Sequence, residues 1–267
     1  MCKILRMMLM MTAAILSTAA MAFDHDYAVY GEALKKHVRW TAGGNSSVVD
    51  YAALKRDPAA LRTSLSTFSA VDKVDFQRWH PDQQQAFLIN AYNAFTLELI
   101  LSRYPDLQSI RDLGSLLSSP WKQSFFALLG EQRSLDWIEH QQLRPRYHDA
   151  RIHFAVNCAS IGCPALRPEP YRAASLDAQL TDQQRRFLSD RSRNRFNASR
   201  GVLSVSSIFK WYGEDFTADN KGLEAWLASQ ASLLADKPVD QARIAKGQFK
   251  LEYLSYDWTL NASGGQR

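Results

Sequence analysis

The sequence is poor in cysteine: only three occur among 267 residues, and one of them, Cys2, lies at the very start. It also lacks internal repeats, low-complexity runs and long linkers rich in proline, glycine or serine. These absences argue against a repeat architecture and against a scaffold held together by many disulfides. After the N-terminal segment, no apolar run approaches the about 18 residues of a membrane-spanning helix, so no further span is expected.

Charge of one sign is also limited. The formal net charge is +5, and basic residues are scattered except in the run 185–195, which is typical of a solvated helix end. A chain this mildly basic does not have the charge footprint of a nucleic-acid-binding protein. We therefore expect no nucleic-acid partner.

What is present at the N-terminus is a pattern typical of a signal peptide. Lys3 and Arg6 precede a short apolar stretch, residues 7–20, and Ala20-Met21-Ala22 forms a small-residue cleavage signal. We predict cleavage after Ala22 and a periplasmic or secreted protein. The exported chain would keep two cysteines, in a compartment where disulfides persist.

The remaining residues, 23–267, are predicted to form a single α+β domain, mainly helical with a small sheet. Residues 82–103 give the strongest helical signal, because Asp82 can cap the start and the following residues are apolar on nearly every face. Alternating apolar residues predict strands at 151–157, 202–206 and 249–253.

Polar side chains interrupt this apolar helix at Asn90 and Asn93, which share one face because they lie three positions apart. A buried amide must find hydrogen-bond partners. The two amides therefore either fix a neighbouring loop or line a polar site.

Three arrangements are open for the pair Cys158 and Cys163. In the first they form a disulfide, because the four intervening residues can bring their Cα atoms to about 5.5 Å. In the second, Cys158 is a nucleophile, His140 is its base and Asn90 orients the imidazole. His153 is a poorer base for Cys158, since a straight strand would separate the two by roughly 16 Å. Glu139 is expected to point away from His140.

In the third arrangement, zinc is held by both cysteines together with His140 and His153. The ligand types suit a tetrahedral zinc site, but their spacing does not match a paired-ligand signature. No metal or other cofactor is therefore assigned from the residues.

Several motifs together resemble the family catalogued as domain of unknown function 547. They are "AFLINAYNAFTLELI", "LDWIEHQQLR", "RIHFAVNCASIGCPAL", "SIFKWYGEDF" and "YLSYDWTLN", from about Phe87 to Asn261. The resemblance implies a domain of undefined biochemical activity. The matching polar positions are Asn90, Tyr92, Asn93, Glu139, His140, Arg144, His153, Cys158 and Cys163.

These observations predict an exported protein with a polar pocket built from histidine, cysteine and asparagine. One hypothesis is a cysteine-dependent hydrolase or acyl transferase acting on amide or ester bonds, with Cys158, His140 and Asn90 catalytic. Asn93, His153 and Arg144 would then bind the substrate. The alternative is a non-enzymatic binding module braced by a Cys158–Cys163 disulfide. The expected partner is a small molecule, a peptide or a cell-envelope ligand.

Overall fold

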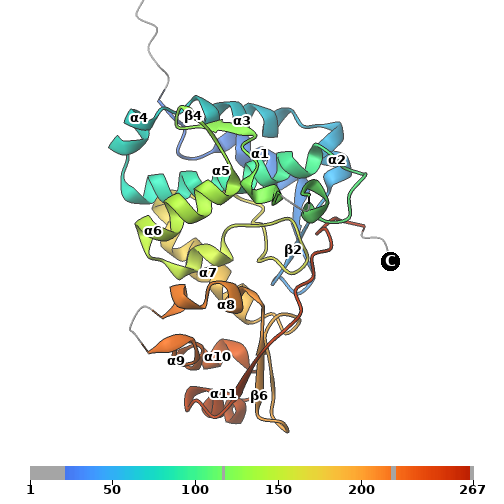
Figure 1. Cartoon of the computed structure of the whole chain (residues 1–267), viewed down its shortest axis with the longest axis vertical. Helices are drawn as coiled ribbons and strands as arrows, with labels where there is room; N and C mark the ends of the chain where they lie inside the picture. The colour runs from blue at the N-terminus through green and yellow to red at the C-terminus, as the bar shows by residue number, and fades with distance from the viewer. Residues whose placement is uncertain (1–21, 116–117, 218–220, 265–267) are drawn as a thin grey trace, which may run out of the picture.

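The longest helix, α5 (Pro81–Leu101), runs through the larger part of the molecule in this computed structural model (Figure 1). The structure describes residues 22–115, 118–217 and 221–264, so the predicted signal peptide lies almost wholly outside the described residues. Every residue from Gln85 to Leu97 is buried, as expected for a helix that is apolar on nearly all faces. The predicted helix is confirmed, although His80 caps it instead of Asp82.

The N-terminal elements pack around this central helix. Contacts join α1 to α3 and α3 to α5, and the short strands β1 and β2 form an antiparallel hairpin. The elements are α1 (Ala28–His37), β1 (Val38–Trp40), β2 (Ser47–Val49), α2 (Tyr51–Arg56), α3 (Ala59–Ala70) and α4 (Lys73–Arg78). Together with α5 they bury the larger of two hydrophobic clusters.

Short elements follow α5 and carry most of the candidate site residues. They are η1 (Ile110–Leu113), η2 (Pro120–Lys122), the hairpin strands β3 (Phe126–Leu128) and β4 (Glu131–Arg133), η3 (Trp137–Leu143), α6 (Arg144–Tyr147), η4 (Ala150–Phe154) and η5 (Ala173–Ser175). The helix that carries His140, η3, is a π-helix. The Ser134 side chain accepts a hydrogen bond from the Trp137 N–H, as a cap does.

The strand predicted at 151–157 is wrong. Residues 150–154 form the 3₁₀ helix η4, whose start is capped by Asp149. All six residues from Ile152 to Asn157 are buried, so the apolar alternation does not separate a buried face from an exposed one. Alternation indicates a strand only where one face meets water.

A smaller part of the molecule contains the sheet and the second hydrophobic cluster. Helix α7 (Leu176–Leu188) leads into it. Its other elements are β5 (Arg195–Asn197), β6 (Val202–Val205), α8 (Ile208–Trp211), η6 (Gly213–Phe216), α9 (Gly222–Ser229), α10 (Ala231–Leu234), α11 (Pro238–Ala245) and β7 (Lys250–Tyr253). Strand β6 pairs antiparallel with β5 and parallel with β7. The strands predicted at 202–206 and 249–253 are thus confirmed.

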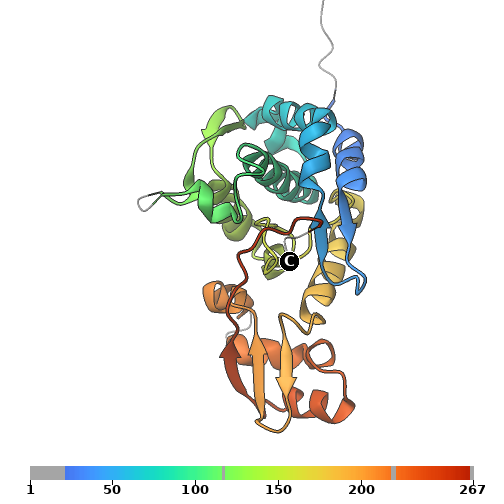
Figure 2. The ribbon, with the colours of Figure 1, turned by 90° about the vertical axis from the view of Figure 1, so that its right-hand side faces the viewer.

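The C-terminal segment, residues 254–264, returns from the sheet to the helical part, as Figure 2 shows in dark red. It forms single bridges from Leu260 to Ser160 and from Ala262 to Val49. Glycine at 162 permits this approach, because a Cβ there would lie 2.9 Å from the Asp257 carbonyl oxygen and the Tyr256 ring. The C-terminal segment is thereby laid against the loop that carries both cysteines.

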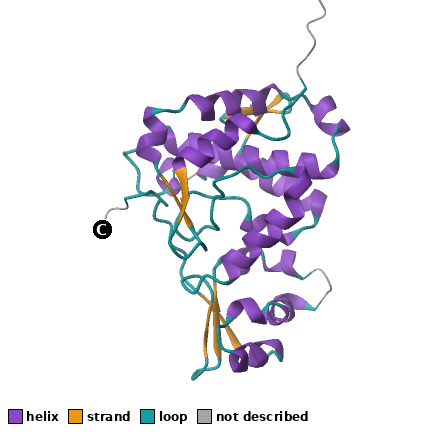
Figure 3. Cartoon of the chain, turned by 180° about the vertical axis from the view of Figure 1, so that it is seen from behind, coloured by secondary structure: helices purple, strands orange, loops and turns teal. Residues whose placement is uncertain are grey.

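The predicted fold class, α+β and mainly helical, is confirmed: helices dominate and strands are confined to small sheets (Figure 3). The chain forms a single domain. Among the described residues, no helix combines the length and apolar character needed to cross a membrane.

Candidate functional site

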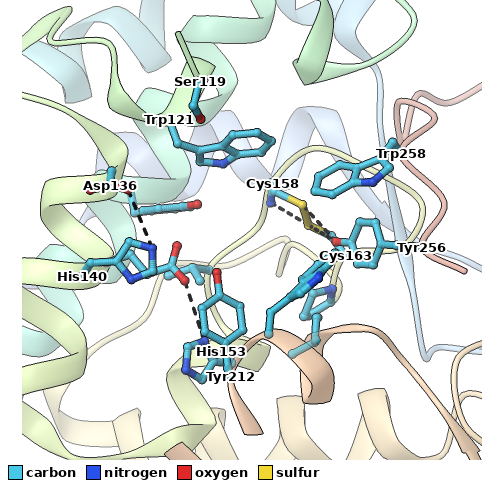
Figure 4. A pocket seen from close by; sticks show the side chains of 16 residues that line it. Ser119, Trp121, Asp136, His140, His153, Cys158, Cys163, Tyr212, Tyr256 and Trp258 are labelled. Atoms are coloured by element: carbon cyan, nitrogen blue, oxygen red, sulfur yellow. Dashed lines mark hydrogen bonds and ion pairs between the residues drawn. A yellow bond between two sulfur atoms is a disulfide. The ribbon is translucent and has the colours of Figure 1, made fainter. Parts of the chain in front are cut away.

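A cavity of about 290 Å³ lies where the two parts of the molecule meet. It is lined by Tyr92, Ser119, Trp121, Asp136, Glu139, His140, His153, Val156, Cys158, Cys163, Pro164, Ile208, Trp211, Tyr212, Tyr256 and Trp258. Of the predicted site residues, it brings together both cysteines and both histidines. Figure 4 shows His140 and the cysteines on different sides of the cavity.

One wall of the cavity is aromatic. The rings of Trp211 and Trp258 are stacked with centroids 5.7 Å apart, and Tyr256 lies 4.5 Å from Trp258. Trp121 meets Trp258 edge-on at 5.7 Å. Trp211 is 44% exposed, which is high for so large an apolar side chain and places it at the rim. This wall presents ring faces and edges to whatever enters the cavity.

The opposite wall is polar. Its side chains come from the π-helix η3 and from Asp136, the residue just before η3. Asp136, Glu139 and His140 all line the cavity, which corrects the expectation that Glu139 points away. Their spacing of three and four positions places them on one helix face. Single turns of π-helix are frequent at functional sites.

Glu139 is the buried carboxylate of this wall, with its side chain only 7% exposed. Burial and the neighbouring carboxylate raise the pKa of the Tyr92 and Tyr212 hydroxyls far above the usual value. Both phenols therefore stay protonated at neutral pH. Glu139 thus places a buried carboxylate in the cavity wall, where Tyr92 and Tyr212 also contribute to the lining.

Behind this wall, Asp215 joins His153 to Arg144. Its carboxylate accepts a 2.6 Å bond from His153 Nε2 and two bonds, of 2.6 and 2.8 Å, from the Arg144 guanidinium. Burial alone would raise the pKa of Asp215, but the hydrogen bonds from His153 and Arg144 outweigh it and hold that pKa well below its usual range. Asp215 is thus ionised, so His153 Nε2 carries a proton.

The other ring nitrogen of His153, Nδ1, has no hydrogen-bond partner among the described residues. The nearest carboxylate oxygen, Oε1 of Glu139, is 3.8 Å away. The His153 side chain is 1% exposed and its ring stacks on Tyr212 at 4.0 Å. An Asp-held imidazole with one free nitrogen is the arrangement that orients a general base.

His140 is held differently. Its Nδ1 lies 3.2 Å from a guanidinium nitrogen of Arg144. Because arginine can only donate, Nδ1 must accept, and neutral His140 then carries its proton on Nε2, on the side of Asp136. Neither nitrogen of His140 is free to take a proton from a thiol in this arrangement.

The two cysteines form a disulfide, with Cα atoms 6.0 Å apart, so the first of the three arrangements is confirmed. Sγ of Cys163 accepts a 2.7 Å bond from the Cys158 N–H. The Tyr256 hydroxyl lies 3.1 Å from the Cys158 sulfur and 3.2 Å from the Cys163 sulfur. The bridge therefore fixes the loop and forms part of the cavity wall. Within the described parts of the chain, no three His, Cys, Asp or Glu residues are grouped as metal ligands.

The two asparagines of α5 fix loops. Asn90 bonds both the N–H and the C=O of Tyr171, at 2.9 and 2.8 Å. Asn93 donates to the Ala155 carbonyl at 3.0 Å and accepts from the Asn157 N–H at 2.8 Å. Asn90 therefore lies against the Tyr171 segment and does not orient His140, which corrects its expected catalytic role. Asn93 positions the loop that leads to Cys158.

Several residues of the site were not predicted from the sequence, chiefly Asp215, Tyr212, Tyr256 and Trp258. They lie in "KWYGEDF" and "YLSYDWTLN", two motifs that carried the family resemblance. Their membership of these motifs is the only sequence feature that singles them out, and neither motif indicates what the residues do. Arg144 was expected to bind substrate, but it contacts Asp215 and His140 and is absent from the cavity lining.

The fold and the cavity define a small α+β protein with an aromatic pocket, a buried carboxylate and a disulfide in its wall. The family model described as "Protein of unknown function, DUF547" matches residues 76–188, which confirms the resemblance over that segment. The match includes Glu139, both histidines and both cysteines, and it ends before Tyr212, Asp215 and the C-terminal aromatic residues. No curated protein and no solved structure matches the chain.

Proposed function

We propose that this chain is an exported, periplasmic or secreted, protein that binds a small ligand in the cavity described above. The observation that carries the proposal is the lining itself: a concave site with aromatic walls and few, convergent polar groups is typical of ligand pockets. A small metabolite, a short peptide or a fragment of the cell envelope would fit this description.

In this function the disulfide is a brace. It closes the loop between Cys158 and Cys163 beside the cavity, while Asn93 fixes the residues just before it. A wall held in place before binding lowers the conformational cost of association. The alternative use of Cys158 as a nucleophile requires a free thiolate, which the bridge withholds.

Blocking the cavity tests the binding function. Ser119 is exposed at the cavity edge, so Ser119→Trp should fill the entrance without disturbing the core. Envelope fragments, peptides and metabolites are first screened for binding to the wild-type protein by tryptophan fluorescence. Any ligand found should bind Ser119→Trp at least tenfold more weakly than it binds the wild type. Ser118→Trp is the matched control, because Ser118 is exposed and lies outside the lining. Equal loss in both variants, or none in Ser119→Trp, would contradict a binding role for this cavity.

A second candidate function is a cysteine hydrolase or acyl transferase, favoured by one observation: Cys158 and His153, whose Nδ1 has no hydrogen-bond partner among the described residues, line the same cavity. A dithiol would first reduce the bridge, supplying two electrons and two protons. The Cys158 thiolate would then attack the carbonyl carbon and form a thioester as the C–N or C–O bond breaks, with protonated His153 donating to the leaving amine or alcohol. Water in a hydrolase, or an acceptor amine or alcohol in a transferase, would then take the acyl group and release the Cys158 thiol. His153 replaces His140 as the base, because the strand that appeared to separate it from Cys158 is absent.

Thiol counting separates the two functions. We expect the exported protein to react with no alkylating reagent before reduction and with two equivalents after it. Opening so short a loop should lower the free energy of unfolding by only about 2 kcal/mol. Two free thiols in the native protein would instead favour the enzyme. Labelling by a thiol-directed probe that carries a reactive carbonyl group should then disappear in Cys158→Ser and persist in Cys163→Ser.

A further inference from the structure

The charges that face the cavity are of one sign. Among the described residues that line it, Asp136 and Glu139 carry carboxylates, and none is lysine or arginine. Arg144 lies behind His140 and shares a bidentate pair with Asp215, so these two charges largely cancel. The two carboxylates of the lining therefore have no lysine or arginine beside them in the cavity wall.

The same cavity is lined by many aromatic rings. Three tryptophans and three tyrosines contribute to the lining, and the faces of aromatic rings attract cations, tryptophan most strongly. Tyr92 and Tyr212 remain neutral because their pKa values are raised. Rings on one side and carboxylates on the other select for a positive charge and against a negative one.

A further buried group points to a hydrogen-bond donor on the ligand. The Nε2 atom of His153 faces Asp215, and Nδ1 has no hydrogen-bond partner among the described residues; in a neutral imidazole that donates through Nε2, Nδ1 is the acceptor. It lies 3.8 Å from the Glu139 carboxylate oxygen. Two acceptors so close, with no donor between them, leave a position that an N–H group would satisfy.

We propose that the cavity binds an organic ammonium cation, with the ammonium group at Glu139 and the Nδ1 atom of His153 and the organic part against the tryptophans. This inference rests on the binding function proposed above and adds the ligand's chemical class. The carboxylate and the aromatic rings both contact the ligand, so the ligand needs a positive charge and an apolar body.

Isothermal titration of the exported, disulfide-bonded protein at pH 7 with a matched pair of probes tests the inference. The probes are 2-phenylethylammonium and 2-phenylethanol, which have nearly the same size and differ in charge. We expect the cation to bind at least tenfold more tightly than the alcohol. Equal affinities, or no measurable binding of the cation, would overturn the ammonium assignment, while the Ser119→Trp comparison would still decide whether the cavity binds another ligand.

Variants locate the charge. Glu139→Gln should weaken binding of the cation at least tenfold and leave the alcohol unchanged. Glu214→Gln is the matched control, because Glu214 is near the site but 82% exposed and absent from the lining. Trp211→Ala provides a second variant that keeps the buried network intact, and it should weaken the cation at least threefold. If Glu139→Gln folds and binds the cation as tightly as the wild type, the proposal is contradicted. If Glu139→Gln does not fold, unchanged affinity of Trp211→Ala for the cation contradicts it.

Discussion

Replacing Asn93 with leucine is expected to lower the free energy of unfolding by about 2–6 kcal/mol. The Asn93 amide is 2% exposed and joins α5 to the Ala155 carbonyl and the Asn157 N–H. Leucine would leave both backbone groups buried without a partner, at about 1–3 kcal/mol each. Urea unfolding followed by circular dichroism measures the change.

The matched control is Thr96→Val on the same helix. Thr96 is 1% exposed, but its hydroxyl donates to the Tyr92 carbonyl of its own helix and ties no other segment of the described chain. We expect this variant to cost about 1 kcal/mol or less. Similar losses in the two variants would mean that the tie between α5 and the loop contributes no more than an ordinary buried hydroxyl.

The second large effect is expected from Asp215→Asn, which should lower the free energy of unfolding by about 2–3 kcal/mol at pH 7. The substitution removes the charge that pairs with Arg144 and His153, and His153 is almost fully buried. Breaking a buried pair by removing one partner costs about 3–5 kcal/mol, reduced here because the Asp215 side chain is 24% exposed.

This loss should depend on pH. Because the pKa of Asp215 is lowered in the folded protein, its charge stabilises the fold at every pH above the ordinary value near 4. That contribution disappears as the pH falls through the folded pKa. The stability difference between wild type and Asp215→Asn, measured by urea unfolding from pH 7 to pH 3, should therefore narrow below about pH 4.

The exposed carboxylate Asp177 is the control for this series. Its side chain is 86% exposed and pairs with Arg151 at the surface. Asp177→Asn should change stability by less than about 1 kcal/mol. A pH-independent loss in Asp215→Asn would show that packing, and not charge, accounts for its effect.

Much of the fold could be predicted from local pattern. The helix α5 follows from an apolar run too long for a strand, and β6 follows from alternation in a segment where Ser204 is more exposed than its neighbours. Strand β7 is also present where alternation predicts it, although Tyr253, one of its alternating apolar residues, is 42% exposed. The same rule failed at residues 151–157, because that segment is buried throughout and the pattern then carries no information about which way side chains point. The two buried asparagines were correctly expected to have partners, and both fix loops.

The site could be predicted only in part, for a physical reason. His140, His153 and both cysteines lie close together in the sequence, so their types and spacing suggest a common site. Asp215 and Trp258 join them only through tertiary packing. The tautomer of His140 also depends on a neighbour, Arg144, whose position no periodicity specifies. Both histidines could thus be identified from the sequence as candidate site residues. Only the structure shows that His140 contacts Arg144 and that His153 contacts Asp215.

The return of the C-terminal segment has a consequence for the order of folding. It closes a very long loop, since the Tyr51 hydroxyl donates to Asn261 across a sequence separation of 210. Contacts of such high contact order form slowly, because loop-closure entropy is lost before they stabilise the chain. The helical core around α5 depends on contacts much nearer in sequence. The aromatic wall supplied by Tyr256 and Trp258 should therefore be among the last features to assemble, and capacity to bind ligand should lag behind helix formation during refolding.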